Sequence, residues 1–218
     1  MKKIQLSKHK VPLLIDFDGT LFNTSALKKE IFLLLSRAGF DQKQIIFAYK
    51  KACEKKLFSY RSLLKHLPQN KTLNTSKIIN LLKKIHYNNK NKLYSDTIIF
   101  LKNIDRKKYQ IILLTLGNPE FQKFKVKNTK IAKYFDALLF TKIEKWEYLP
   151  KYLSKKQNFV MIDDREDTIA KIGEKFPNAK ALCIVREVSD TDDPTKTKKA
   201  EGIKKIKALT KEAVFGNN

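Results

Sequence analysis

Two pairs of acidic residues stand at the ends of short apolar runs in this sequence. Asp16 and Asp18 close the run that begins at Val11. Asp163 and Asp164 close a second run much later in the chain. Carboxylates that share one place raise each other's pKa and destabilise a fold unless a cation joins them. Mg²⁺ prefers oxygen ligands and binds phosphate at the same time, so the acids predict a magnesium site if the two runs lie side by side.

Hydroxyl, amide and lysine side chains, together with one glycine, follow two further apolar runs. They are Thr115, Gly117 and Asn118 after one run, and Thr141, Lys142 and Lys145 after the other. A lysine and a hydroxyl beside a metal would hold an anionic group, and a carboxylate would supply a nucleophile. This combination is typical of phosphoryl transfer. The sequence has no GxGxxG loop, no Walker loop and no Ser/His pair at the end of a run that would favour another chemistry.

The apolar runs themselves predict the architecture that would bring these side chains together. Each run is short and apolar throughout, as strands buried on both faces of a parallel sheet are. Helical patterns between the later runs indicate strand–helix–strand alternation, and ligands of such sheets bind beyond the carboxyl ends of the strands. We therefore predict an α/β protein with a Rossmann-like three-layer core, whose parallel strands lie at 11–17, 109–115, 135–140, 158–163 and 180–185.

A long helical stretch separates the first two predicted strands. Between Phe22 and Tyr94 the sequence shows no strand pattern, and capped helical patterns recur at 23–40, 41–53 and 75–85. We therefore expect an all-helical cap domain at residues 23–93, inserted into a catalytic core formed by residues 1–22 and 94–218. After the last strand we expect a polar loop at 189–202 and a short helix at 203–214.

The composition limits the kinds of partner. The 218 residues include 46 basic and 22 acidic ones, a net charge of +24, but only five of the basic residues are arginine. Specific nucleic-acid readers rely on arginine, and these lysines are spread over nearly every predicted helix. We therefore favour a compositional drift toward lysine over a functional basic surface, and both explanations of the charge stay open. The two cysteines form no metal motif, and no run approaches membrane-spanning length. We expect a cytoplasmic monomer or weak dimer that acts on a small phosphorylated substrate without a membrane.

Three stretches of the sequence carry a resemblance to a known family. "DFDGTLF", "IILLTLGN" and "VMIDDRED" resemble the first, second and fourth motifs of the haloacid dehalogenase (HAD) superfamily, and a lysine before the last stretch would be the third motif. The resemblance spans Val11 to about Arg186, and the helical stretch resembles a C1-type cap. It implies a hydrolase that works with Mg²⁺ through an aspartyl-phosphate.

The resemblance also implies a role for each matching residue. Asp16 would be the nucleophile, and Asp18 would be the general acid for the leaving group and then the base for water. Gly19 would permit the turn that brings backbone amides toward the phosphate, and Thr115 would hydrogen-bond the phosphoryl oxygens. Further substrate contacts would come from Thr20, Gly117 and Asn118. The metal ligands would be Asp16, Asp18 through its backbone carbonyl, Asp163 and Asp164, with Asp167 as a supporting acid.

The third motif is the loosest match, because the usual Lys-Pro pair is absent. Lys142 and Lys145 both follow the third predicted strand, and either could reach the site. We favour Lys145 as the catalytic lysine because it opens an amphipathic segment, and we treat Lys142 as a substrate contact. Lys151 lies farther along the same segment.

Asp18 favours a phosphatase over a dehalogenase, because an alkoxide leaving group needs a proton donor and a halide does not. Our hypothesis is a Mg²⁺-dependent phosphatase that hydrolyses a small phosphate monoester. A nucleotide or nucleic-acid-end phosphatase, a phosphomutase, and a basic nucleic-acid-binding protein with a vestigial site remain open. A phospho-acceptor signalling domain would share the Asp, Thr and Lys chemistry, but the helical insert argues against it.

Overall fold

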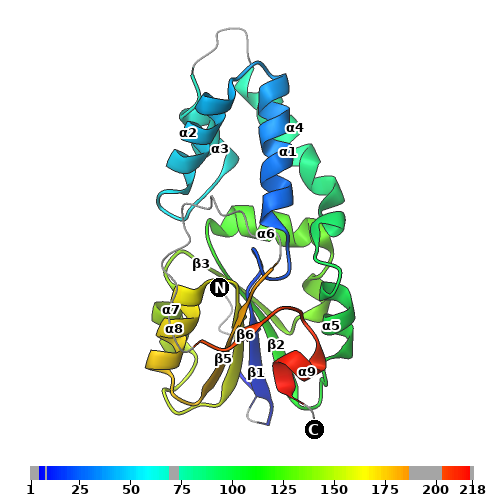
Figure 1. Cartoon of the computed structure of the whole chain (residues 1–218), viewed down its shortest axis with the longest axis vertical. Helices are drawn as coiled ribbons and strands as arrows, with labels where there is room; N and C mark the ends of the chain where they lie inside the picture. The colour runs from blue at the N-terminus through cyan, green and yellow to red at the C-terminus, as the bar shows by residue number, and fades with distance from the viewer. Residues whose placement is uncertain (1–4, 8, 69–73, 187–202, 217–218) are drawn as a thin grey trace.

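The computed structural model describes residues 5–7, 9–68, 74–186 and 203–216 (Figure 1). Its strands are β1 Val11–Ile15, β2 Tyr109–Leu116, β3 Ala137–Thr141, β4 Phe159–Asp163, β5 Ala179–Ile184 and β6 Lys205–Ile206. In the described residues they form one parallel sheet in the order β3-β2-β1-β4-β5-β6. β1 lies between β2 and β4, with Leu13 beside Ile111 on one side and Val160 on the other. Residues that follow β1, β2 and β4 therefore meet at one edge of the sheet.

Helical segments cover both faces of the sheet. In the described part of the chain they are α5 Thr97–Asn103, α6 Pro119–Thr129, η2 Ala132–Tyr134, α7 Lys145–Tyr148, η3 Leu149–Lys151, α8 Glu166–Lys175 and α9 Lys211–Phe215. Because alternate strand residues point to opposite faces, Leu13 and Ile15 pack with α5, α6 and α9, whereas Leu14 and Ile112 pack with α7 and α8. Figure 1 shows these layers, and the predicted three-layer α/β fold is confirmed. None of the helices in the described ranges has the length and apolar composition to span a membrane.

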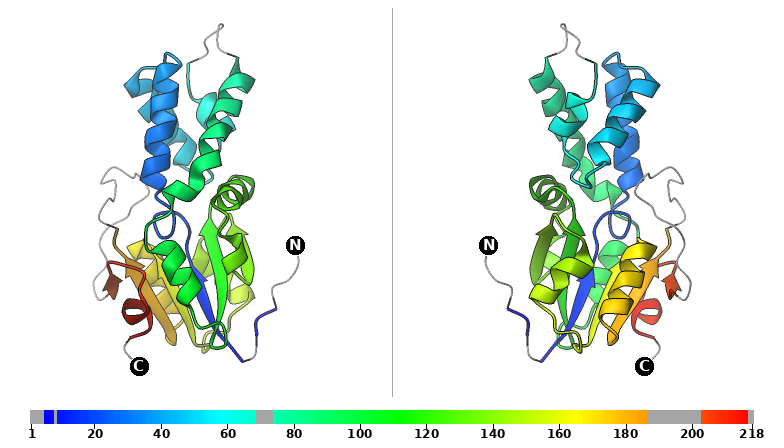
Figure 2. Two further views of the ribbon diagram at one scale, coloured as in Figure 1. Left: turned by 90° about the vertical axis from the view of Figure 1, so that its right-hand side faces the viewer. Right: turned by 90° about the vertical axis from the view of Figure 1, so that its left-hand side faces the viewer.

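A helical insert, residues 24–92, lies between β1 and α5. Its described segments are α1 Thr24–Arg37, α2 Gln42–Cys53, α3 Tyr60–Lys65, α4 Thr75–Lys84 and η1 Ile85–Lys92. Side-chain caps set their starts: Asn23 accepts the N–H of Ala26, and Asp41 accepts that of Gln44, each at 2.9 Å. Figure 2 shows the insert standing beyond the carboxyl ends of the strands. The assignment of residues 23–93 to a separate cap domain stays a prediction.

The C-terminal segment differs from the single helix predicted at 203–214. Lys205–Ile206 instead extend the sheet as β6, with Ile206 beside Ile184 of β5. Helix α9 begins only after Thr210, whose side chain caps it. The helical prediction was wrong for the first half of the segment because the free edge of β5 offers backbone partners that a local pattern does not reveal. The polar loop predicted at 189–202 lies outside the described residues.

Candidate active site

Three carboxylates gather where β1 and β4 end. Asp16 follows β1 directly, and its N–H donates to the carbonyl of Ile162 in β4 at 2.9 Å, which places it beside Asp163. Asp16 and Asp163 are both buried. Oxygen atoms of Asp16, Asp163 and Asp164 lie within 4.8 Å of one another, and we call these three residues the acidic trio. The parallel sheet thus brings the two predicted acidic groups together.

The acidic trio has the chemistry of a site for a hard divalent cation. It offers only carboxylate oxygens, which are the ligands that Mg²⁺ prefers. No second group of three or more acidic, histidine or cysteine side chains with this spacing occurs in the described residues. The trio therefore fits the cation that the family resemblance implies. The carboxylate of Asp18 is not part of it.

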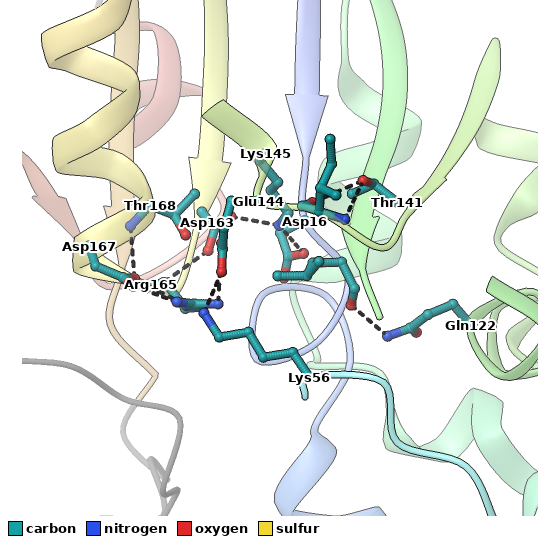
Figure 3. A network of polar contacts seen from close by, with 12 residues as sticks. Asp16, Lys56, Gln122, Thr141, Glu144, Lys145, Asp163, Arg165, Asp167 and Thr168 are labelled. Atoms are coloured by element: carbon teal, nitrogen blue, oxygen red, sulfur yellow. Dashed lines mark hydrogen bonds and ion pairs between the residues drawn. The ribbon is translucent and has the colours of Figure 1, made fainter. Parts of the chain in front are cut away.

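Lys145 supplies positive charge inside the acidic trio (Figure 3). It is the first residue of α7 and is buried, and its ammonium donates to the carboxylates of both Asp16 and Asp163, the latter at 2.6 Å. Burial disfavours the charge, but the two carboxylates outweigh it and raise the pKa of Lys145. Lys142 and Lys151 are exposed. Of the three lysines considered for the third motif, the structure brings Lys145 to the acids.

The surroundings of Asp16 disfavour the ionised form of its carboxyl group. The pKa of Asp16 is raised to about 7, mainly by burial; the ammonium of Lys145 opposes the rise, and the neighbouring carboxylates of Asp163 and Asp18 add to it. A cation bound to the acidic trio would favour the ionised form. The ionisation of Asp16 is therefore expected to depend on the metal.

The carboxylate of Asp18 is held by three side chains that the sequence did not indicate. Lys125 in α6 donates to both oxygens, at 2.5 and 2.6 Å. Gln122 in α6 and Thr24 at the start of α1 each donate to one oxygen at 2.8 Å. Burial would raise the pKa of Asp18, but Lys125 and then the hydrogen bonds of all three residues lower it. Asp18 is therefore ionised and fixed in this structure.

Two buried hydroxyl groups in the segments that end at this edge of the sheet have no hydrogen-bond partner in the described structure. They belong to Thr115 near the end of β2 and Thr20 in the loop after β1. Thr115 lies two residues past Leu113, which pairs with Ile15, so it is level with the residues just after Asp16. A buried hydroxyl without a partner lowers stability unless a ligand or water supplies one. The hydroxyl of Thr115 is thus suited to an oxygen atom of a bound ligand.

Three of the predicted substrate contacts, Gly19, Gly117 and Asn118, hydrogen-bond to the protein backbone in this structure. The N–H of Gly19 donates to the carbonyl of Phe22, and that of Gly117 donates to the carbonyl of Thr141, each at 2.9 Å. The side chain of Asn118 accepts two N–H groups from the first turn of α6 and caps that helix. In this structure the groups make hydrogen bonds within the loops that they shape, and their role as substrate contacts stays a prediction.

Replacing Gly19 with alanine is expected to disturb the acidic trio and weaken Mg²⁺ binding. Gly19 has φ +72°, a conformation that destabilises an L residue by about 1–2 kcal/mol, and an added Cβ would overlap the carboxylate of Asp164. Gly39→Ala is the matched control, because φ is +93° there and no atom lies near the added Cβ. Both variants should lose stability in urea, but calorimetry should show weaker Mg²⁺ binding in Gly19→Ala alone. Equal binding by the two variants would contradict the role of this turn.

Ion pairs on the rim of the site connect the helical insert to the core (Figure 3). Lys56, between α2 and α3, donates to Glu144, the residue before Lys145. Arg165 lies 3.8 Å from Glu144 and donates to both oxygens of Asp167, one of them at 3.1 Å. Asp167, considered as a supporting acid, is thus paired with Arg165 outside the trio. Nothing in the sequence marks Lys56, because its contact joins segments 88 residues apart and it resembles the other lysines of the insert.

The family model for haloacid dehalogenase-like hydrolases matches residues 13–174. The chain therefore belongs to this family, and it is a hydrolase. A comparison with curated proteins finds no match.

Solved structures of the same family share the fold at low sequence identity. A haloacid dehalogenase-like hydrolase from Burkholderia xenovorans superimposes with a TM-score of 0.70 and 13% identity over 96% of this chain and 100% of that chain. A magnesium-bound HAD hydrolase from Bacillus subtilis superimposes with a TM-score of 0.62 and 13% identity, over 97% of this chain and 100% of that chain. The L-2-haloacid dehalogenase of Xanthobacter autotrophicus, with chloropropionic acid covalently bound, has a TM-score of 0.58 and 14% identity. The superposition covers 94% of this chain and 97% of that chain. The similarity extends over nearly the whole of each chain.

Proposed function

We propose that this hydrolase is a Mg²⁺-dependent phosphatase that cleaves a small phosphate monoester through an aspartyl-phosphate on Asp16. The acidic trio carries this proposal: it gathers three carboxylates within 4.8 Å of one another, and a divalent cation bound there would offset the repulsion between them. A haloacid would bring a further carboxylate to this place, whereas Mg²⁺ offsets the charge of a phosphate. The magnesium-bound relative from B. subtilis supports the same view.

The proposed reaction consists of two displacements at phosphorus. An oxygen of Asp16 would attack, forming an acyl phosphate while the bond to the leaving alcohol breaks. Asp18, ionised beforehand, would take the proton that a monoester monoanion carries and pass it to the leaving oxygen. Water would then attack the acyl phosphate, giving a proton to Asp18 and releasing inorganic phosphate. Thr115 and Lys145 would hydrogen-bond the phosphoryl oxygens, and bound Mg²⁺ would offset their charge.

The helical insert is proposed to act as a cap over this site. Its helices stand beyond the carboxyl edge of the sheet, and Lys56 reaches Glu144 next to Lys145 (Figures 2 and 3). The B. subtilis relative is described as showing interdomain movement. A similar movement here would break and remake the pair of Lys56 and Glu144, exclude water during the reaction, and select the substrate.

The purified protein is expected to hydrolyse p-nitrophenyl phosphate with Mg²⁺ and to lose this activity in EDTA, because the acidic trio needs the cation. Release of p-nitrophenolate measures the first reaction, and release of chloride from 2-chloropropionate measures the competing one. Chloride release without phosphatase activity, or phosphatase activity that survives EDTA, would overturn the proposal. Nucleotides and end-phosphorylated oligonucleotides in the same assay separate a small monoester from a nucleic-acid end as substrate.

A further inference from the structure

Lys125 is unusual in this lysine-rich chain because it is buried. It is 3% exposed, and its ammonium lies 5.4, 5.6 and 5.3 Å from the ring centroids of Phe17, Phe22 and Phe121. Lysines commonly bury their stems but keep the ammonium in water. An ammonium withdrawn from water destabilises the fold unless a carboxylate pairs with it. Here the paired carboxylate is that of Asp18.

The contacts of Asp18 use its capacity as an acceptor and fix its orientation. Its two oxygens accept two hydrogen bonds from Lys125, one from Gln122 and one from Thr24. A carboxylate has about four acceptor sites, so a substrate oxygen must replace one of these partners. Lys125 differs from the other two because it contacts both oxygens. It can therefore stay on one oxygen while the other turns to the substrate.

We propose that Lys125 is a positioning residue that holds Asp18 in place for proton transfer to the leaving group, an inference that rests on the proposed phosphatase function. During this step one oxygen of Asp18 exchanges Gln122 or Thr24 for the leaving-group oxygen, and Lys125 keeps its hold on the other. The proton passes from Asp18 to the alkoxide as the P–O bond breaks, and Lys125 neither gives nor takes a proton. If Asp18 is misplaced, the rate of hydrolysis should therefore fall most for esters whose leaving group needs this proton.

The test compares two esters of similar size, phenyl phosphate and p-nitrophenyl phosphate, in Lys125→Met. The kcat for phenyl phosphate is expected to fall about 10- to 100-fold, since general acid catalysis contributes at least this much. The kcat for p-nitrophenyl phosphate should fall several-fold less, because p-nitrophenolate leaves without a full proton transfer. Lys125→Arg should restore the ratio of the two rates, because its guanidinium can contact both oxygens. Lys123→Met, an exposed neighbour on α6, should leave both rates unchanged.

Equal losses on both esters, or no loss, would overturn the positioning role while leaving the phosphatase function intact. In an Asp18→Asn background, Lys125→Met should cause no further loss, whereas an additive loss would mean a merely structural role. If Lys125→Met does not fold, Lys125→Gln is measured in the same way with the same criteria. If the wild-type protein hydrolyses neither ester, the proposed function fails and the positioning role fails with it.

Discussion

Replacing Asp16 with asparagine is expected to abolish phosphate-ester turnover while leaving the protein folded. Asparagine keeps the shape of the side chain but cannot form an acyl phosphate, and loss of a nucleophile lowers kcat by about 10⁴- to 10⁶-fold. The neutral amide should destabilise the metal-free protein only slightly, because Lys145 keeps its pair with Asp163 and because burial already disfavours the charge of Asp16, whose pKa is raised to about 7. Steady-state kinetics with Mg²⁺ and urea unfolding in EDTA measure the two effects.

Glu120→Gln provides the matched control for this variant. Glu120 is an exposed acid in the first turn of α6, at the same edge of the sheet, and it pairs with Lys123 at 3.2 Å. Exposed ion pairs contribute little to stability, so both activity and stability should stay at the wild-type level. Substantial turnover by Asp16→Asn would exclude Asp16 as the nucleophile, and a large loss of stability would contradict the account of its surroundings.

The position of the acidic trio follows from short stretches of sequence. Strands of a parallel sheet are apolar on both faces, so the continuous apolar runs at 11–17 and 158–163 can be recognised as strands from the sequence. Once these strands are neighbours, their register places Ile15 beside Ile162, and the residues that follow must meet. A carboxylate directly after a buried strand has little freedom, and the meeting of Asp16 with Asp163 was therefore predictable.

The contacts of long side chains were not predictable in the same way. The reach of a lysine depends on its rotamers and on which face of its helix packs, and both are set by distant segments. Lys125 is buried because α6 lies against the rings of Phe17 and Phe22, and Lys56 meets the core only because the insert stands over it. The sequence around Lys125 and around Lys56 does not distinguish them from the other lysines of the chain. Lys145 could be favoured in advance because it opens an amphipathic segment.

Replacing Lys145 with methionine is expected to make the stability of the protein depend on Mg²⁺. The ammonium of Lys145 is the partner of two buried carboxylates, those of Asp16 and Asp163. Removing one member of a buried ion pair lowers the free energy of unfolding by about 3–5 kcal/mol, because the remaining charges lose their compensation. Mg²⁺ bound to the trio would replace the lost positive charge, and ligands that bind only the folded state stabilise it. Urea unfolding in EDTA and in excess Mg²⁺ measures the difference.

Lys142→Met is the control that makes this result specific to one lysine. Lys142 lies three residues earlier and is exposed, so its replacement should change the free energy of unfolding by no more than about 0.5 kcal/mol, with or without Mg²⁺. Equal stability of the two variants in EDTA would show that Lys145 does not balance the acids. A loss in Lys145→Met that Mg²⁺ does not reduce would mean that the acidic trio fails to bind the cation. In either case the proposed phosphatase would lose the charge balance on which it depends.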